Sequence, residues 1–149
     1  MRRALLFVAA LPFVLSACTD LYGLGDDDFE GYYDYDADVN GAFDEYVTGY
    51  IRITSERRDR AYVTIDWRWR EDGYTILRIR SESSAIARIR GDRIEFEFEG
   101  DYWTGGRWVP FRLYHEGRLS GRTIRGDWWL DMQGYADEQG DFTARRDRY

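Results

Sequence analysis

The sequence contains one cysteine, one histidine, two prolines and no lysine among its 149 residues. A zinc site therefore lacks the set of nitrogen and sulfur ligands from which such sites are usually built. A nucleophilic serine usually requires a histidine or lysine base, and the one histidine, His115, stands before the turn-forming residues Glu116 and Gly117, where we expect it to be solvated. A glycosidase needs two carboxylates that flank a cleft, which so small a domain barely provides. We therefore expect a protein that is not an enzyme.

Long apolar runs are also missing, apart from residues 4–14 near the N-terminus. This run follows Arg2 and Arg3 and is too short for the roughly 20 residues of a membrane-spanning helix, so it is typical of a secretory signal. The tetrapeptide Leu15-Ser16-Ala17-Cys18 comes next. It resembles the lipobox of bacterial lipoprotein precursors, in which a branched apolar residue and two small residues precede the cysteine that receives the lipid.

The resemblance implies that residues 1–17 are a signal peptide and that Cys18 carries several acyl chains, palmitate among them. Each buried methylene contributes about 0.8 kcal/mol, so this anchor would hold the protein durably in the bacterial cell envelope. Thr19 follows the cysteine where an aspartate could stand, which by resemblance to Gram-negative lipoproteins implies the outer membrane, if the organism has one. The alternatives are an uncleaved N-terminal anchor and an ordinary signal peptide that ends near a cysteine.

The net charge of −7 is unevenly distributed along the chain. Residues 19–45 hold ten acidic residues and no basic one, whereas residues 46–149 hold 18 acidic residues and 19 arginines. The nearly neutral second part offers no basic surface for nucleic acid. Because like charges repel and extend a chain, we expect residues 18–45 to be a lipid-anchored acidic tether and residues 46–149 to be the folded domain.

Residues 36–44 match the first nine positions of an EF-hand calcium loop. The candidate oxygen ligands are Asp36, Asp38, Asn40 and Asp44. The match then fails, because the bidentate glutamate of the twelfth position is Val47 and neither flank has a helical pattern. A looser calcium site therefore stands against an acidic turn that leads into the first strand, and we expect no other cofactor.

From residue 46 onward, apolar and polar residues alternate, as in Val63, Ile65 and Trp67 with polar neighbours between them. This period of two indicates half-buried antiparallel strands. We expect eight or nine strands and no helix. They include strands over residues 74–80, 85–90, 107–114, 118–124 and 127–133, with turns at residues 115–117 and at Arg125-Gly126. Closing such a meander removes its exposed edges, so the prediction is an all-β, up-and-down barrel. In topology it resembles the small calycin-type barrels.

Arginine and glutamate side chains on the second face of these strands favour an outer surface in water over a membrane-spanning barrel. Large residues such as Trp67, Trp69, Phe96 and Phe98 can fill an eight-stranded barrel completely, so no internal ligand cavity is expected. Strand parity places Trp67, Trp69 and Trp128 in the core.

Trp103, Trp108 and Trp129 are expected outside the core, in a glycine-flanked loop or out of phase with apolar neighbours. An exposed aromatic patch of this kind suits binding of an envelope protein, peptidoglycan or glycan. The alternative is a passive structural component of the envelope whose tryptophans are covered by the acidic segment. A third reading comes from residues 102–106, which resemble the Tyr-Trp-Thr-Lys-Gly segment of membrane-bound inhibitors of C-type lysozyme, with Gly105 in place of the lysine.

Overall fold

The computed structural model of the chain describes residues 29–57, 59–80 and 84–147. These residues form antiparallel strands joined by short turns, and none of them forms a helix long and apolar enough to cross a membrane. The strands are β1 (Gly31–Asp38), β2 (Glu45–Arg57), β3 (Arg60–Glu71), β4 (Tyr74–Arg80), β5 (Ala85–Arg90), β6 (Arg93–Thr104), β7 (Arg107–Ser120), β8 (Thr123–Met132) and β9 (Glu138–Arg146).

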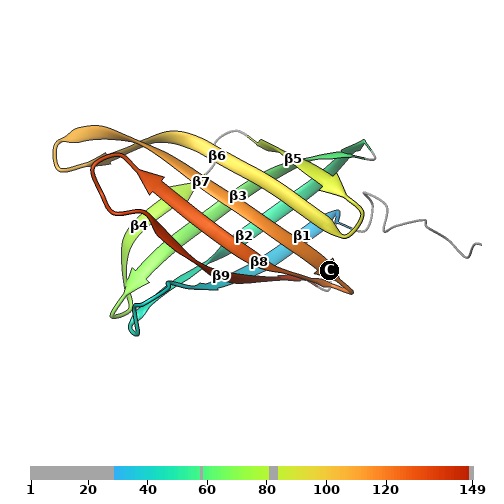
Figure 1. The fold of residues 1–149 in the computed structure, drawn as a ribbon, viewed down its shortest axis with the longest axis horizontal. Coiled ribbons are helices and arrows are strands. Elements are labelled where there is room, and N and C mark those ends of the chain that lie inside the picture. The colour runs from blue at the N-terminus through green and yellow to red at the C-terminus, as the bar shows by residue number, and fades with distance from the viewer. Residues whose placement is uncertain (1–28, 58, 81–83, 148–149) are drawn as a thin grey trace, which may run out of the picture.

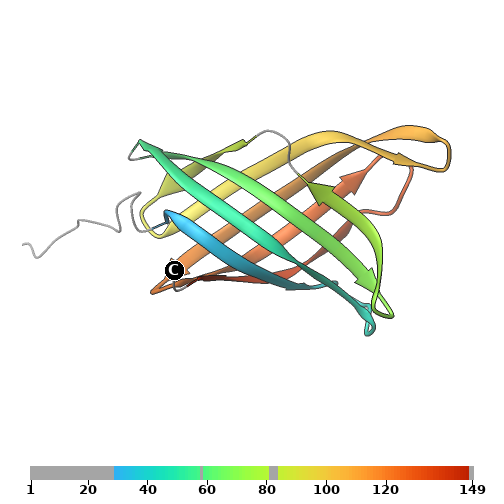
Figure 2. The same ribbon diagram turned by 180° about the vertical axis from the view of Figure 1, so that it is seen from behind.

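The strands form one sheet that closes on itself (Figures 1 and 2). The order is β2-β1-β9-β8-β7-β6-β5-β3-β4, and the pairing of β2 with β3 closes the barrel. Strand β3 pairs along one edge with β2, while its other edge pairs with β5 at one end and β4 at the other. β4 and β5 therefore share one place in the wall, which makes a barrel of eight strands plus one extra. The predicted all-β closed barrel is confirmed.

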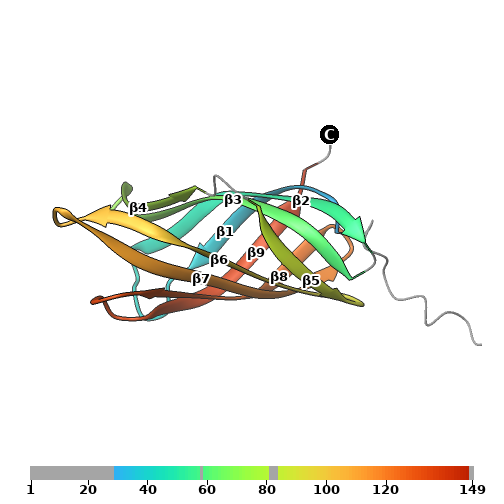
Figure 3. The same ribbon diagram turned by 90° about the horizontal axis from the view of Figure 1, so that it is seen from above.

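The wall is incompletely paired between β4 and β6. Strand β5 pairs with β6 only over Arg93, Ile94 and Glu95, and no pairing joins β4 to β6 in the described part of the chain. The second half of β6 therefore has a partner, β7, on one side only. Figure 3 shows β4 and β6 lying apart at this end of the barrel.

The middle of the barrel is filled by large side chains, as the alternation predicts. Trp67 and Trp128 are fully buried, and their ring centroids lie 5.4 Å apart in an edge-to-face contact. Phe96 and Phe98 are buried on β6. Trp69 is half-buried and packs against this core. The core assignment of the three tryptophans is thus confirmed, with Trp69 at the edge of the core.

The first strand lies inside the segment that we expected to be a tether. β1 occupies Gly31–Asp38 and pairs with both β2 and β9, so the barrel cannot close without it. Its buried Tyr33, Tyr35 and Ala37 alternate with exposed aspartates that face water. The tether prediction is therefore wrong for residues 29–45, because the aspartates of β1 are the outward-facing residues of a strand and alternate with buried ones. Residues 18–28, the signal peptide and the lipobox lie outside the described residues.

Two predicted turns, in the regions of β7 and β8, are wrong. β7 continues through His115, Glu116 and Gly117, and the chain turns only after Ser120. Gly126, assigned to a second turn, lies within β8 directly opposite Gly117. Both glycines are strand residues at a close approach of two backbones, so their role is to make room rather than to reverse the chain.

Candidate functional site

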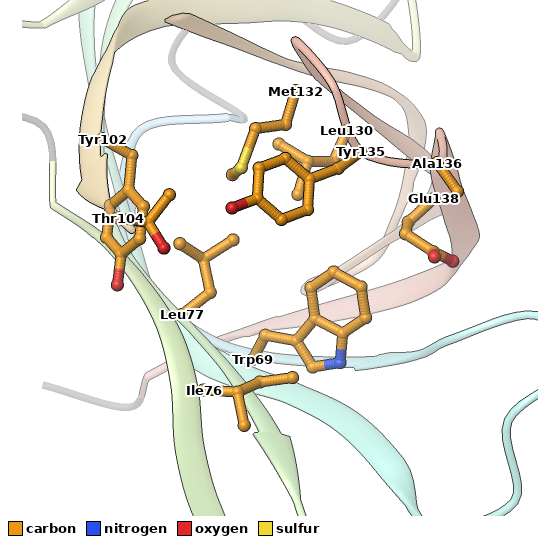
Figure 4. Close-up of a pocket in the computed structure, with 10 residues that line it drawn as sticks. All are labelled: Trp69, Ile76, Leu77, Tyr102, Thr104, Leu130, Met132, Tyr135, Ala136 and Glu138. Atoms are coloured by element: carbon orange, nitrogen blue, oxygen red, sulfur yellow. The ribbon is translucent and has the colours of Figure 1, made fainter. Parts of the chain in front are cut away.

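One end of the barrel holds a cavity of about 240 Å³ (Figure 4). Its apolar lining comes from Trp69 on β3, Leu77 on β4, and Leu130 and Met132 on β8. Tyr102 on β6 completes this lining. The expectation of a barrel without a ligand cavity is therefore wrong at this end. In the described part of the chain, β4 and β6 are not paired at this end of the barrel.

Tryptophan rings separate the cavity from the middle of the barrel. Trp69 contacts both Trp67 and Trp128 edge to face, with centroid distances of 6.2 and 6.4 Å. The Trp69 indole N–H donates to Glu45 Oε2 at 2.8 Å. This hydrogen bond fixes the orientation of the Trp69 ring, which is thus presented to the cavity in a defined position.

The loop between β8 and β9, residues 133–137, borders the cavity with Tyr135 and Ala136. The Tyr135 N–H donates to the Met132 carbonyl at 3.0 Å, and Gly134 has φ of 85°, which favours glycine. Tyr135 is exposed although its ring lines the cavity, so it stands between the cavity and solvent.

The polar groups of the cavity are few. Thr104 contributes a hydroxyl and Glu138, the first residue of β9, a half-buried carboxyl group. Burial raises the pKa of Glu138, and the nearby charge of Glu45 raises it further. Sequence reasoning missed Glu138 and Tyr135, because they lie in and after a loop whose residues show no hydrophobic period.

The three tryptophans predicted to be exposed are exposed, but they do not form one patch. Trp103 and Trp108 are 54% and 65% exposed, and their rings lie 5.2 Å apart at the tip of the β6–β7 hairpin. Trp129 is 37% exposed and contacts Tyr114, with ring centroids 5.3 Å apart. Trp108 and Tyr114 are six positions apart on β7, a distance of about 20 Å along the strand. Two small aromatic pairs thus replace the predicted patch.

The predicted calcium loop is not formed. Asp36 and Asp38 are exposed residues of β1, and the turn begins only at Asn40, whose N–H donates to the Gln139 carbonyl at 2.9 Å. Within residues 29–57, 59–80 and 84–147, no three Asp, Glu, His or Cys side chains come together to hold a metal ion, so Asp36, Asp38 and Asp44 do not converge. The pairing of β1 with β2 keeps Asp36 and Asp38 extended, and Asp44 lies in the loop that follows.

His115 is buried in the barrel and not solvated in a turn. It is 0% exposed, stacks on Phe96 at 4.7 Å, and contacts Phe142 edge to face at 5.3 Å. Its Nε2 is hydrogen-bonded to the Tyr35 hydroxyl at 3.0 Å. Burial lowers the pKa of His115 to about 3, so the ring is neutral at physiological pH.

No protein-family model matches the sequence, and no curated protein matches it significantly. Among solved structures, the barrel is similar to EF1p2_mFAP2b bound to DFHBI, with a TM-score of 0.58 and 10% identity over 83% of this chain and 97% of that chain. It is also similar to a redesigned beta barrel, mFAP1, bound to DFHBI, with a TM-score of 0.52 and 8% identity over 81% of this chain and 98% of that chain. At such low identity, the similarity establishes the fold alone.

Proposed function

We propose that the barrel is a non-enzymatic binding module that takes a small, largely apolar ligand into the end cavity. The observation that carries this proposal is the cavity of about 240 Å³, lined by Trp69, Leu77, Leu130 and Met132 where β4 and β6 are not paired in the described part of the chain. Pockets for drug-sized ligands measure roughly 300–1,000 Å³, so a single ring or a short alkyl chain is the appropriate size. That two barrels of similar fold were solved with DFHBI bound supports a binding role.

A substitution at the mouth of the cavity tests this function. Ala136 is exposed and lines the cavity, so Ala136→Phe should occupy the ligand's space without disturbing the core. We expect neutral single-ring compounds such as benzyl alcohol and indole to shift the NMR signals of Trp69 and Met132, and Ala136→Phe to weaken binding at least tenfold.

The matched control is Gln133→Phe, which adds the same ring to the same loop at a position that does not line this cavity. It should bind as the wild type does. Unchanged affinity in Ala136→Phe would show that the compounds bind elsewhere. The absence of binding by any compound would favour the passive structural component.

We also propose that the protein is a lipid-anchored envelope protein, on the strength of the tetrapeptide that ends at Cys18. The described chain enters the barrel at Phe29, beside Tyr33 and near the C-terminal end of β9. The cavity is lined by Met132 at the end of β8 and by Glu138 at the start of β9. The start of β9 lies at the opposite end of the barrel from its C-terminal end (Figure 1). The segment that leads from Cys18 therefore joins the barrel at the end opposite the cavity.

Replacing the single cysteine tests the anchor. Cys18→Ala should abolish metabolic labelling with a fatty acid and should prevent cleavage after Ala17, because processing requires the modified cysteine. Ser16→Ala preserves a small residue at its position and should keep the label. Label that persists on Cys18→Ala would refute lipid attachment at this residue.

A further inference from the structure

We infer that the ligand of the end cavity is a small organic cation, an ammonium group on a single aromatic ring or a short alkyl chain. This inference depends on the proposed binding function and specifies its ligand. The inference is drawn from the carboxylates and aromatic rings around the cavity. None of the described residues that line the cavity is basic.

Two carboxylates lie on one side of the cavity. Glu138 lines it directly, and Glu45 accepts the hydrogen bond from the Trp69 indole N–H. The two are close enough that the charge of Glu45 raises the pKa of Glu138. Their shared position therefore concentrates negative charge beside the cavity.

Neither carboxylate is neutralised by an arginine. The ion pairs of the described residues involve other acids, and none includes Glu45 or Glu138. Arg107 lies against Gly134 in the loop that borders the cavity, but it is exposed, does not line the cavity and takes part in none of these ion pairs. A carboxylate that has lost part of its hydration is stabilised by an opposite charge nearby. A bound ammonium group would supply that charge.

The other walls suit a cation with an apolar body. Trp69, Tyr102 and Tyr135 present aromatic rings to the cavity, and Figure 4 shows the rings of Trp69 and Tyr135 on two sides of the space with Glu138 beside them. Aromatic rings attract cations through their electron-rich faces, most strongly where water is excluded. Leu77 and Met132 would contact the apolar part. An anionic ligand would face the same carboxylates and be repelled.

Three compounds of similar shape test the inference on the full chain: benzylammonium, benzyl alcohol and benzoate. At pH 7 and low salt, NMR titration should give a dissociation constant at least tenfold lower for benzylammonium than for benzyl alcohol, with benzoate binding most weakly. Glu138→Gln should remove most of the difference between the dissociation constants of benzylammonium and benzyl alcohol. Glu99→Gln, which removes an exposed carboxylate paired with Arg112, should behave as the wild type.

The outcomes separate this inference from the function on which it depends. If benzyl alcohol binds and Ala136→Phe blocks it, but benzylammonium binds no better, the cavity binds ligands and the cation inference is wrong. Full cation preference in Glu138→Gln would also overturn it. If none of the three compounds binds, the proposed function itself fails.

Discussion

Acidification from pH 6.5 to about 3 should lower the free energy of unfolding, and most of this loss should be absent in a variant that lacks His115. The pKa of His115 is lowered by burial from its ordinary value of 6.5 to about 3 in the folded barrel. Between these two values the unfolded chain takes up a proton that the folded chain refuses. The stabilisation that depends on neutral His115 is therefore fully present above pH 6.5. It decreases as the pH falls toward 3, with a slope of up to about 1.4 kcal/mol per pH unit.

The comparison variant for this prediction is the double substitution Tyr35→Phe with His115→Phe. His115 stacks on Phe96, so a phenyl ring suits the site, and removing both hydrogen-bond partners leaves neither member of the pair buried alone. Urea unfolding of both proteins at several pH values between 3 and 7 measures the difference, which should grow to several kcal/mol at the acid end. Parallel curves for the two proteins would mean that His115 becomes protonated within the folded barrel.

Tyr35→Phe alone should be more harmful than the double substitution. It leaves His115 Nε2 buried without its partner, whereas His115 Nδ1 already lacks one among the described residues. An unpaired buried polar group costs roughly 1–3 kcal/mol. Such non-additivity, measured at pH 7, would show that the Tyr35–His115 pair acts as a unit.

The strands could be predicted where one face is apolar and the other polar, because period two is a local property of the sequence. β4 and β5 were predicted with the bounds that the structure shows, since turn residues flank both. β1 was missed although Tyr33, Tyr35 and Ala37 have the same period, because the aspartates between them indicate an extended acidic chain equally well. Only the neighbouring strands β2 and β9 decide between the two readings.

The site could be predicted less well, because it depends on contacts between distant parts of the chain. Parity predicted that Trp108 and Trp129 are exposed, and the flanking glycines predicted the same for Trp103. Neither pattern predicted the length of β7 that separates Trp103 and Trp108 from Trp129. The cavity results from a missing pairing between β4 and β6, which no local pattern encodes. The burial of His115 was also not predicted, because a histidine beside Glu116 and Gly117 gives a local turn signal.

Glycines account for the remaining misassigned turns, and they lead to the prediction with the largest effect. Gly126→Ala should lower the free energy of unfolding by more than the roughly 1–3 kcal/mol typical of overpacking. A methyl group on Gly126 would overlap the carbonyl oxygen of Glu116 and approach the Cα of Gly117, the residue opposite it in β7. These are backbone atoms, so only a separation of β7 from β8 could relieve the overlap.

Gly100→Ala is the matched control, because Gly100 also lies within a strand and its added methyl group would meet only the Phe111 ring, at 3.1 Å. A ring on the half-buried Phe111 can move, and alanine restricts the unfolded chain, so its effect should stay within about 1 kcal/mol. Urea unfolding at pH 7 compares the two variants. Equal stabilities would mean that β7 and β8 do not approach closely at Gly117 and Gly126. A selective loss in Gly126→Ala would show that this glycine allows the two strands to pair, where a local reading of Arg125-Gly126 predicts a turn.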